Sequence, residues 1–140
     1  LSIRRQRQMC IRDRAGVDLT RLLVVRPPPD ALSRVAVRVA TSRAFAVIVV
    51  DTAGVPGDGQ KAERLDRWAI VVRRLALAIE GTTTTLLLLT DQGAARSLPL
   101  PTAMRIELDR PSEDRLTLRV AKDRRGRVTQ PASIPLRRPA

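Results

Sequence analysis

The chain has 140 residues and a net charge of +12, from 26 basic and 14 acidic residues, and its length suits one domain with its own core. Because it has one cysteine and no histidine, the composition excludes an internal disulfide, a zinc site of cysteine and histidine, and catalysis that needs histidine. No apolar run approaches the roughly 18 residues of a membrane span. We therefore expect a soluble, cytoplasmic protein without membrane contacts.

The basic residues gather at the two ends of the chain. Residues 1–14 hold five arginines and one aspartate, and residues 115–140 hold seven arginines, one lysine and one aspartate. The two segments therefore carry +4 and +7 of the total charge. Only Phe45 and Trp68 are aromatic, which argues against a base-stacking surface of the RRM or OB type.

The leader LSIRRQRQMCIRDR, residues 1–14, shows neither helical nor strand periodicity, and the composition changes abruptly at Ala15. Its MCIRDR run resembles translated sequencing-adapter read-through. The alternative is a disordered basic arm. We expect the domain to occupy residues 15–136, with residues 137–140 as a tail.

The first half of the domain contains two short apolar runs with one amphipathic segment between them. The run RLLVV at residues 21–25 predicts a strand that ends at a row of prolines. A helix should follow, with Asp30 near its positive end. The run at residues 46–50 is apolar at every position, which predicts a parallel strand covered on both faces.

A second helix is predicted at about residues 60–80, with an apolar stripe at steps of three and four and Gly81 as its left-handed C-cap. TLLLLT at residues 85–90 predicts another buried strand. The order strand, helix, strand, helix, strand, joined by right-handed crossovers, predicts a three-layer α/β fold with a mostly parallel sheet.

The last third shows strict alternation of apolar and polar residues at 104–109 and 116–121. This period of two predicts antiparallel strands at the C-terminal edge of the sheet. KDRRGR at residues 122–127 predicts a turn between strands. Pro131 and Pro135 predict that the final segment lies at an edge or leaves the sheet.

Polar residues follow the two apolar parallel runs. Asp51 ends the first run, and Asp91 and Gln92 follow the second, so all three should emerge at one edge of the sheet. An apolar strand that ends in aspartate is the Walker-B arrangement, in which the carboxylate orients Mg²⁺ and its water beside a phosphate. The alternative is an aspartate that starts a turn or caps a backbone amide.

In this order, the features resemble a known family. From Gly16 to about Leu136 the chain resembles the second half of the RecA-like ATPase core, a P-loop NTPase fold, and more closely the RecA-like ImuA proteins of DNA repair. The segments that carry the resemblance are GVDLTRLLVVRP, DALSRVAVRVATSRA, AVIVVDTAG, TLLLLTDQ, AMRIELDR and LRVAKDRRGR.

The resemblance implies ATP and Mg²⁺ as cofactors of the full-length protein. Asp51 would be the Walker-B carboxylate that holds Mg²⁺ through water, with Thr52 beside it. Gln92 would sense the γ-phosphate, and Lys122 and Arg124 would reach ATP across an interface between like subunits. The implied roles lie in DNA repair, recombination, the SOS response to DNA damage or translesion synthesis. No residue of the chain is assigned to catalysis.

The chain also departs from the family pattern. No P-loop motif G-x-x-x-x-G-K-[ST] occurs in the sequence. We expect it to precede Gly16 in the gene, so that the full-length protein would be a DNA-dependent ATPase, whereas this chain alone binds no cofactor. The two loops that contact DNA in RecA are short here. We expect weak, phosphate-directed DNA contacts through Lys61, Arg64, Arg96 and the C-terminal arginines.

Two other interpretations stay open. The first is a non-catalytic RecA-like scaffold that docks translesion polymerase components or like subunits, which would fit the short loops. The second is a GTPase that uses DTAG at residues 51–54 to hold magnesium. The later strand of a GTPase should end in N/T-K-x-D, whereas this chain has TDQG at residues 90–93, which argues against guanine recognition.

Overall fold

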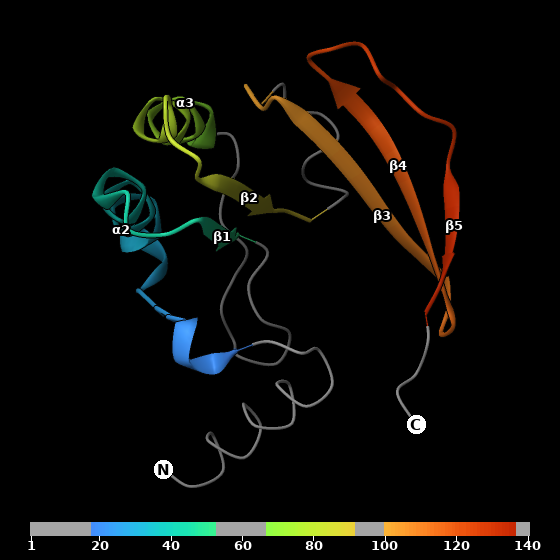
Figure 1. The fold of residues 1–140 in the computed structure, drawn as a ribbon, viewed down its shortest axis with the longest axis horizontal. Coiled ribbons are helices and arrows are strands. Elements are labelled where there is room, and N and C mark those ends of the chain that lie inside the picture. Colours follow the sequence, from blue (N-terminus) through green and yellow to red (C-terminus); the bar gives the residue numbers. More distant parts are fainter. Residues whose placement is uncertain (1–17, 53–66, 92–99, 137–140) are drawn as a thin grey trace, which may run out of the picture.

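A computed structural model describes residues 18–52, 67–91 and 100–136 of the chain. The described residues form helices and strands of a mixed α/β type, shown in Figure 1. In chain order these are η1 (Leu19–Arg21), α2 (Pro29–Ser42), β1 (Val47–Asp51), α3 (Trp68–Ile79), β2 (Thr85–Leu89), β3 (Met104–Ser112), β4 (Arg115–Asp123) and β5 (Ala132–Pro135). No helix within these ranges has the length and apolar character needed to span a membrane.

Helix α2 forms where the sequence predicts a helix. Pro29 stands in the first turn, where a missing N–H forfeits no intrahelical hydrogen bond, and Asp30 lies at the positive end of the helix dipole. The helix ends because Arg43 adopts a left-handed conformation with φ 54° and donates its N–H to the carbonyl oxygen of Ala40 at 3.2 Å. The start and the stop are thus both local.

Helix α3 presents the predicted apolar stripe, since Trp68, Val72 and Leu75 are buried. Just beyond the helix, Gly81 has φ 70°, which a glycine adopts without strain. The helix ends where the sequence predicts, but its C-cap is Glu80, which is extended with φ −60° and ψ 134°, so the prediction of Gly81 as the C-cap is wrong. The predicted start near Gln60 lies outside the described residues.

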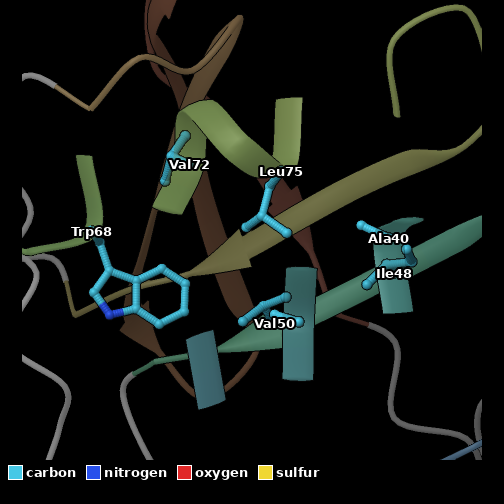
Figure 2. Packing of buried hydrophobic residues seen from close by; sticks show 7 residues of the cluster. Ala40, Ile48, Val50, Trp68, Val72 and Leu75 are labelled. Carbon is cyan, nitrogen blue, oxygen red and sulfur yellow. The ribbon is translucent and has the colours of Figure 1, made fainter. Parts of the chain in front are cut away.

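Strands β1 and β2 pair in parallel, with Val47 opposite Thr85 and Asp51 opposite Leu89, which confirms their predicted orientation. Helices α2 and α3 pack against one face of this pair (Figure 1). Figure 2 shows the core between the helices and β1. Its buried members are Ala36, Ala40, Ile48, Val50, Trp68, Val72 and Leu75. Each large apolar side chain contributes about 1.5–3 kcal/mol on burial, so this cluster holds the unit together.

The other face of the β1–β2 pair is open among the described residues. Val47, Val49, Leu87 and Leu89 point to that side and are exposed. The expectation that these strands are covered on both faces is therefore wrong for the described part of the chain. An apolar residue at every position indicates that burial of both faces of a strand is favourable, but it does not identify the element that buries them.

The predicted strand at residues 21–25 is also wrong. Arg21 closes η1, and residues 22–25 follow without regular structure and with exposed side chains. A strand forms only where a neighbour completes its hydrogen-bond ladder. In the described two-stranded sheet β1 pairs with β2, and residues 22–25 do not join that sheet.

Strands β3, β4 and β5 form a second, antiparallel sheet in that order. Ile106 lies opposite Val120 and Leu108 opposite Leu118, which confirms the predicted antiparallel strands. The edge position of the proline-containing segment is confirmed too, because β5 ends at Pro135 and pairs on one side only, with β4.

The alternating pattern predicts these strands at the edge of one mostly parallel sheet, whereas the described residues form two separate sheets. The β3–β4 ladder is interrupted between Arg105 and Ile106 and again between Asp109 and Ser112. Such irregularities bend a strand and increase its twist, which favours a separate ribbon. The three-layer RecA-like fold as a whole stays a prediction.

The polar face of this ribbon is organised by one acid. Glu107 accepts hydrogen bonds from Arg105 on its own strand, with Nη2 3.1 Å from Oε1, and from Arg119 on β4, with Nε 3.1 Å from Oε2. Its side chain is only 10% exposed. On β3 the apolar side chains of Ile106 and Leu108 are the more exposed ones, so this sheet also presents an open apolar face.

Candidate functional site

The candidate site lies where the two parallel strands end. Because β1 and β2 run in the same direction with Asp51 opposite Leu89, the residues that follow both strands leave the sheet at the same edge. In Figure 1 both arrows point toward the side on which β3 lies. Carboxyl ends of parallel strands are the usual position of ligand sites in open α/β sheets.

Asp51 is the last residue of β1 and is exposed. Side chains alternate along a strand, so Asp51 shares the open face with Val47 and Val49 and points away from the helices. Asp51 takes part in an interaction within the fold. The structure thus puts Asp51 at the predicted edge of the sheet.

Thr52 has a different environment. Its side chain is buried, with the residue 3% exposed. Its backbone N–H and its hydroxyl both donate to the carbonyl oxygen of Leu89, at 3.0 Å and 2.8 Å. Thr52 therefore ties the end of β1 to the end of β2. Its predicted part in nucleotide binding stays a prediction, and the geometry gives the hydroxyl a structural role.

Asp91 follows β2 by two residues and is exposed, so it lies at the same edge as Asp51. Like Asp51, it takes part in an interaction within the fold. Gln92, the predicted γ-phosphate sensor, lies outside the described residues. So do the predicted DNA-binding residues Lys61, Arg64 and Arg96.

The chemistry of this edge suits a hydrated magnesium ion. Mg²⁺ keeps several water ligands and binds proteins through one or two carboxylates together with phosphate oxygens of the substrate. Asp51 and Asp91 supply two exposed carboxylates. No cluster of three acidic, histidine or cysteine side chains occurs within residues 18–52, 67–91 and 100–136. The described part of the chain thus fits one side of a Mg²⁺–phosphate site, and not a cage made of protein ligands alone.

The two basic residues that the resemblance implies lie at the end of β4. Lys122 is exposed, and its Nζ donates to the carbonyl oxygen of Leu100 at 3.2 Å. Leu100 itself packs against the core cluster, so this bond ties the antiparallel ribbon to the segment that enters it. Arg124 is exposed just beyond β4, and its backbone N–H donates to the carbonyl oxygen of Ala103 at 2.8 Å. Their predicted reach to ATP of a like subunit stays a prediction.

Asp123, between these two residues, builds the turn that presents them. Its carboxylate accepts the N–H of Arg125 at 2.9 Å and Nε of Arg127 at 2.7 Å, and its side chain is 5% exposed. These bonds lower the pKa of Asp123, the Arg125 amide being the larger cause. Gly126, with φ 74°, completes the turn.

Comparisons with protein families, with curated proteins and with solved structures find no match to this chain. The family resemblance stated above therefore stays a prediction. Sequence reasoning missed the bond from Thr52 to Leu89 and the bond from Lys122 to Leu100, because both depend on long-range positions. For Asp123 a signal existed, since aspartate at the start of an Arg-Arg-Gly turn commonly accepts a backbone N–H two residues later.

Proposed function

We propose that this chain supplies one side of an ATP–Mg²⁺ site in a RecA-like protein, similar to the ImuA proteins, that acts in DNA repair, recombination or damage-induced translesion synthesis. The observation that carries the proposal is the parallel register of β1 and β2, with Asp51 opposite Leu89. This register puts Asp51, the proposed Walker-B carboxylate, at the same edge of the sheet as Asp91. Ligands of open α/β sheets bind at such an edge.

In this proposal Asp51 orients Mg²⁺ through a bound water, and the ion neutralises charge on the phosphates. Gln92 would respond to the γ-phosphate. The 140 residues contain no P-loop motif, so the backbone that cradles the phosphates would come from outside this sequence. The protein would be a DNA-dependent ATPase if such a motif precedes this sequence in its gene.

The test is Mg²⁺-dependent ATP binding by the gene product that carries this sequence, measured by calorimetry with Asp51→Asn. Residues that hold a metal through an outer-shell contact typically contribute 10- to 100-fold to its affinity, and we expect a loss of that size. Asp109→Asn is the matched control, because it makes the same change at an exposed carboxylate of β3. Equal ATP affinity in wild type and in Asp51→Asn would contradict the proposal.

A second candidate function, a RecA-like scaffold that docks translesion polymerase components, is supported by the open apolar faces. Val49 and Leu87 of the parallel pair and Ile106 and Leu108 of the ribbon are exposed, and patches of this kind mark interaction sites. A pulldown with polymerase components separates the two functions. A scaffold keeps its partners and its activity in DNA-damage survival with Asp51→Asn, whereas an ATP-driven motor loses that activity.

A further inference from the structure

The solvent side of the two-helix layer is lined by arginines without partners. Arg34 and Arg38 on α2 and Arg73 and Arg74 on α3 are exposed. Within the described residues none of the four makes a hydrogen bond or an ion pair through its guanidinium. Even Asp30, one helical turn before Arg34, forms no pair with it.

The four arginines share one surface because of helical periodicity. On α2 the buried residues Ala36 and Ala40 belong to the core, and at 100° per residue Arg34 and Arg38 fall about 120–160° from them. Ala31, in the first turn, is buried on the arginine side and lies outside this core cluster. On α3 the buried residues Trp68, Val72 and Leu75 face the core, and Arg73 and Arg74 fall on either side of the opposite direction. Both helices cover the same face of the β1–β2 pair (Figure 1). Their outer sides therefore form one surface, which we call the arginine surface.

Four of the seven arginines in residues 104–136, by contrast, have guanidinium partners, whereas Arg115, Arg124 and Arg125 have none among the described residues. Arg105 and Arg119 share Glu107, Arg127 pairs with Asp123, and Arg110 donates to the carbonyl oxygens of Ser112 and Glu113. An ordinary solvated surface mixes charges of both signs, and like charges four residues apart weaken a helix. The arginine surface has no acid within α3 and only Asp30 within α2. A one-signed field of this kind attracts a polyanion.

We propose that the arginine surface binds the phosphate backbone of nucleic acid. Guanidinium groups match phosphate oxygens in a bidentate geometry. Arg34 and Arg38 are about 6 Å apart along the helix axis, and packed helices lie about 8–10 Å apart, so the four charges cover an area that crosses several phosphates. This site differs from Lys61, Arg64 and Arg96, and it does not depend on the ATP site.

The test is the salt dependence of DNA binding, measured by fluorescence anisotropy with a labelled duplex and the 140-residue chain without nucleotide. Each phosphate contact contributes about 0.9 to the slope of log affinity against log salt. The double variants Arg34→Gln/Arg38→Gln and Arg73→Gln/Arg74→Gln should each lower that slope by about 1.8 and weaken binding about 60-fold at 0.1 M salt. Circular dichroism checks that each variant keeps its fold.

Arg105→Gln/Arg110→Gln is the matched control, because it removes two charges that already have partners and lie outside the C-terminal arginines. It should leave the slope unchanged. An equal loss in the control would show that binding follows net charge alone, and would overturn the inference. So would unchanged slopes in both helix variants, or a loss confined to Lys61→Gln/Arg64→Gln/Arg96→Gln, and neither result would affect the proposed ATP site. Displacement of the DNA by polyglutamate at equal charge concentration would favour an acidic protein as the partner and would also overturn it.

Discussion

Two leucines of α3 provide a direct test of the orientation of the helix. Leu75 is 1% exposed and belongs to the core, whereas Leu77, two residues later, is 67% exposed. Leu75→Ala and Leu77→Ala are the same chemical change in the same helix. They should therefore differ only through the side of the helix on which each residue lies.

The size of the effect follows from the packing. Leu→Ala in a protein core costs about 2–5 kcal/mol, and the cost rises with the cavity that remains. The core around Leu75 has one helix layer on one side and the strands on the other, and the strands have an open outer face. This site can partly collapse, so we expect the lower part of the range, about 2–3 kcal/mol. Leu77→Ala should stay within about 0.5 kcal/mol of wild type, because it alters an exposed side chain.

The assay is urea unfolding followed by far-UV circular dichroism. With a slope of about 1–2 kcal/mol per molar urea for a small unit, Leu75→Ala should lower the midpoint by roughly 1–3 M. Leu77→Ala should leave the midpoint nearly unchanged. If Leu77→Ala proves as destabilising as Leu75→Ala, α3 is rotated relative to the core. Arg73 and Arg74 would then not lie on its solvent side, and the arginine surface would fail with the core assignment.

Two further predictions concern polar groups. Thr52→Val should lower the free energy of unfolding in urea by about 1 kcal/mol, because the bond from the Thr52 hydroxyl to Leu89 is lost. Thr52→Ser should retain most of the stability. Unchanged unfolding together with a loss of ATP binding would instead make Thr52 a nucleotide ligand. The Arg125 amide and the Arg127 guanidinium hold the pKa of Asp123 below its ordinary 3.8. Asp123 should therefore stabilise the end of the β3–β4 ribbon fully above pH 3.8, and this contribution should be lost as the pH falls through the lowered pKa. Amide exchange of the turn measured against pH should show this loss in wild type, and its persistence in Asp123→Asn would refute the assignment.

The helices and their ends could be predicted from the sequence because their causes are local. Pro29 and Asp30 start α2 through conformation and charge, and Gly81 directly follows Glu80, the extended residue that ends α3. The parallel orientation of β1 and β2 was also predictable, since a helical connection of this length returns the chain to the same direction. Local chemistry and connection length together specified the unit that carries Asp51.

The strand at residues 21–25 and the cover of β1 could not be predicted in the same way. An apolar run indicates that exposure of the segment to water is unfavourable, but the structure of the segment depends on a partner elsewhere in the chain. Residues 22–25 are as apolar as β1, yet they have no strand partner and stay exposed. The error at β1 has the same origin, because Val47 and Val49 are apolar on a face without cover.

Some residues of the candidate site could be predicted from local sequence, whereas others depend on contacts with distant parts of the chain. Asp51 was predictable because strand direction alone determines the edge at which it emerges. The role of Thr52 was not, because its hydroxyl bonds to Leu89, 37 residues away in sequence. The bond from Lys122 to Leu100 spans 22 residues and depends on how the ribbon folds back. Residue type therefore indicates possible chemistry, and long-range register decides which of these groups remain available to a ligand.

The charge of the chain shows why this distinction matters for function. A count of +12 does not separate arginines that stabilise the fold from those that can bind a partner. Antiparallel register puts Glu107 opposite Arg119, so that this acid engages both Arg119 and Arg105. Helix α3 has no acid in its sequence, so Arg73 and Arg74 find no partner within it. Four arginines without guanidinium partners in the described part of the chain therefore lie over the helices, on the side of the parallel pair opposite the apolar face. A polyanion could bind there without disturbing the strand ends.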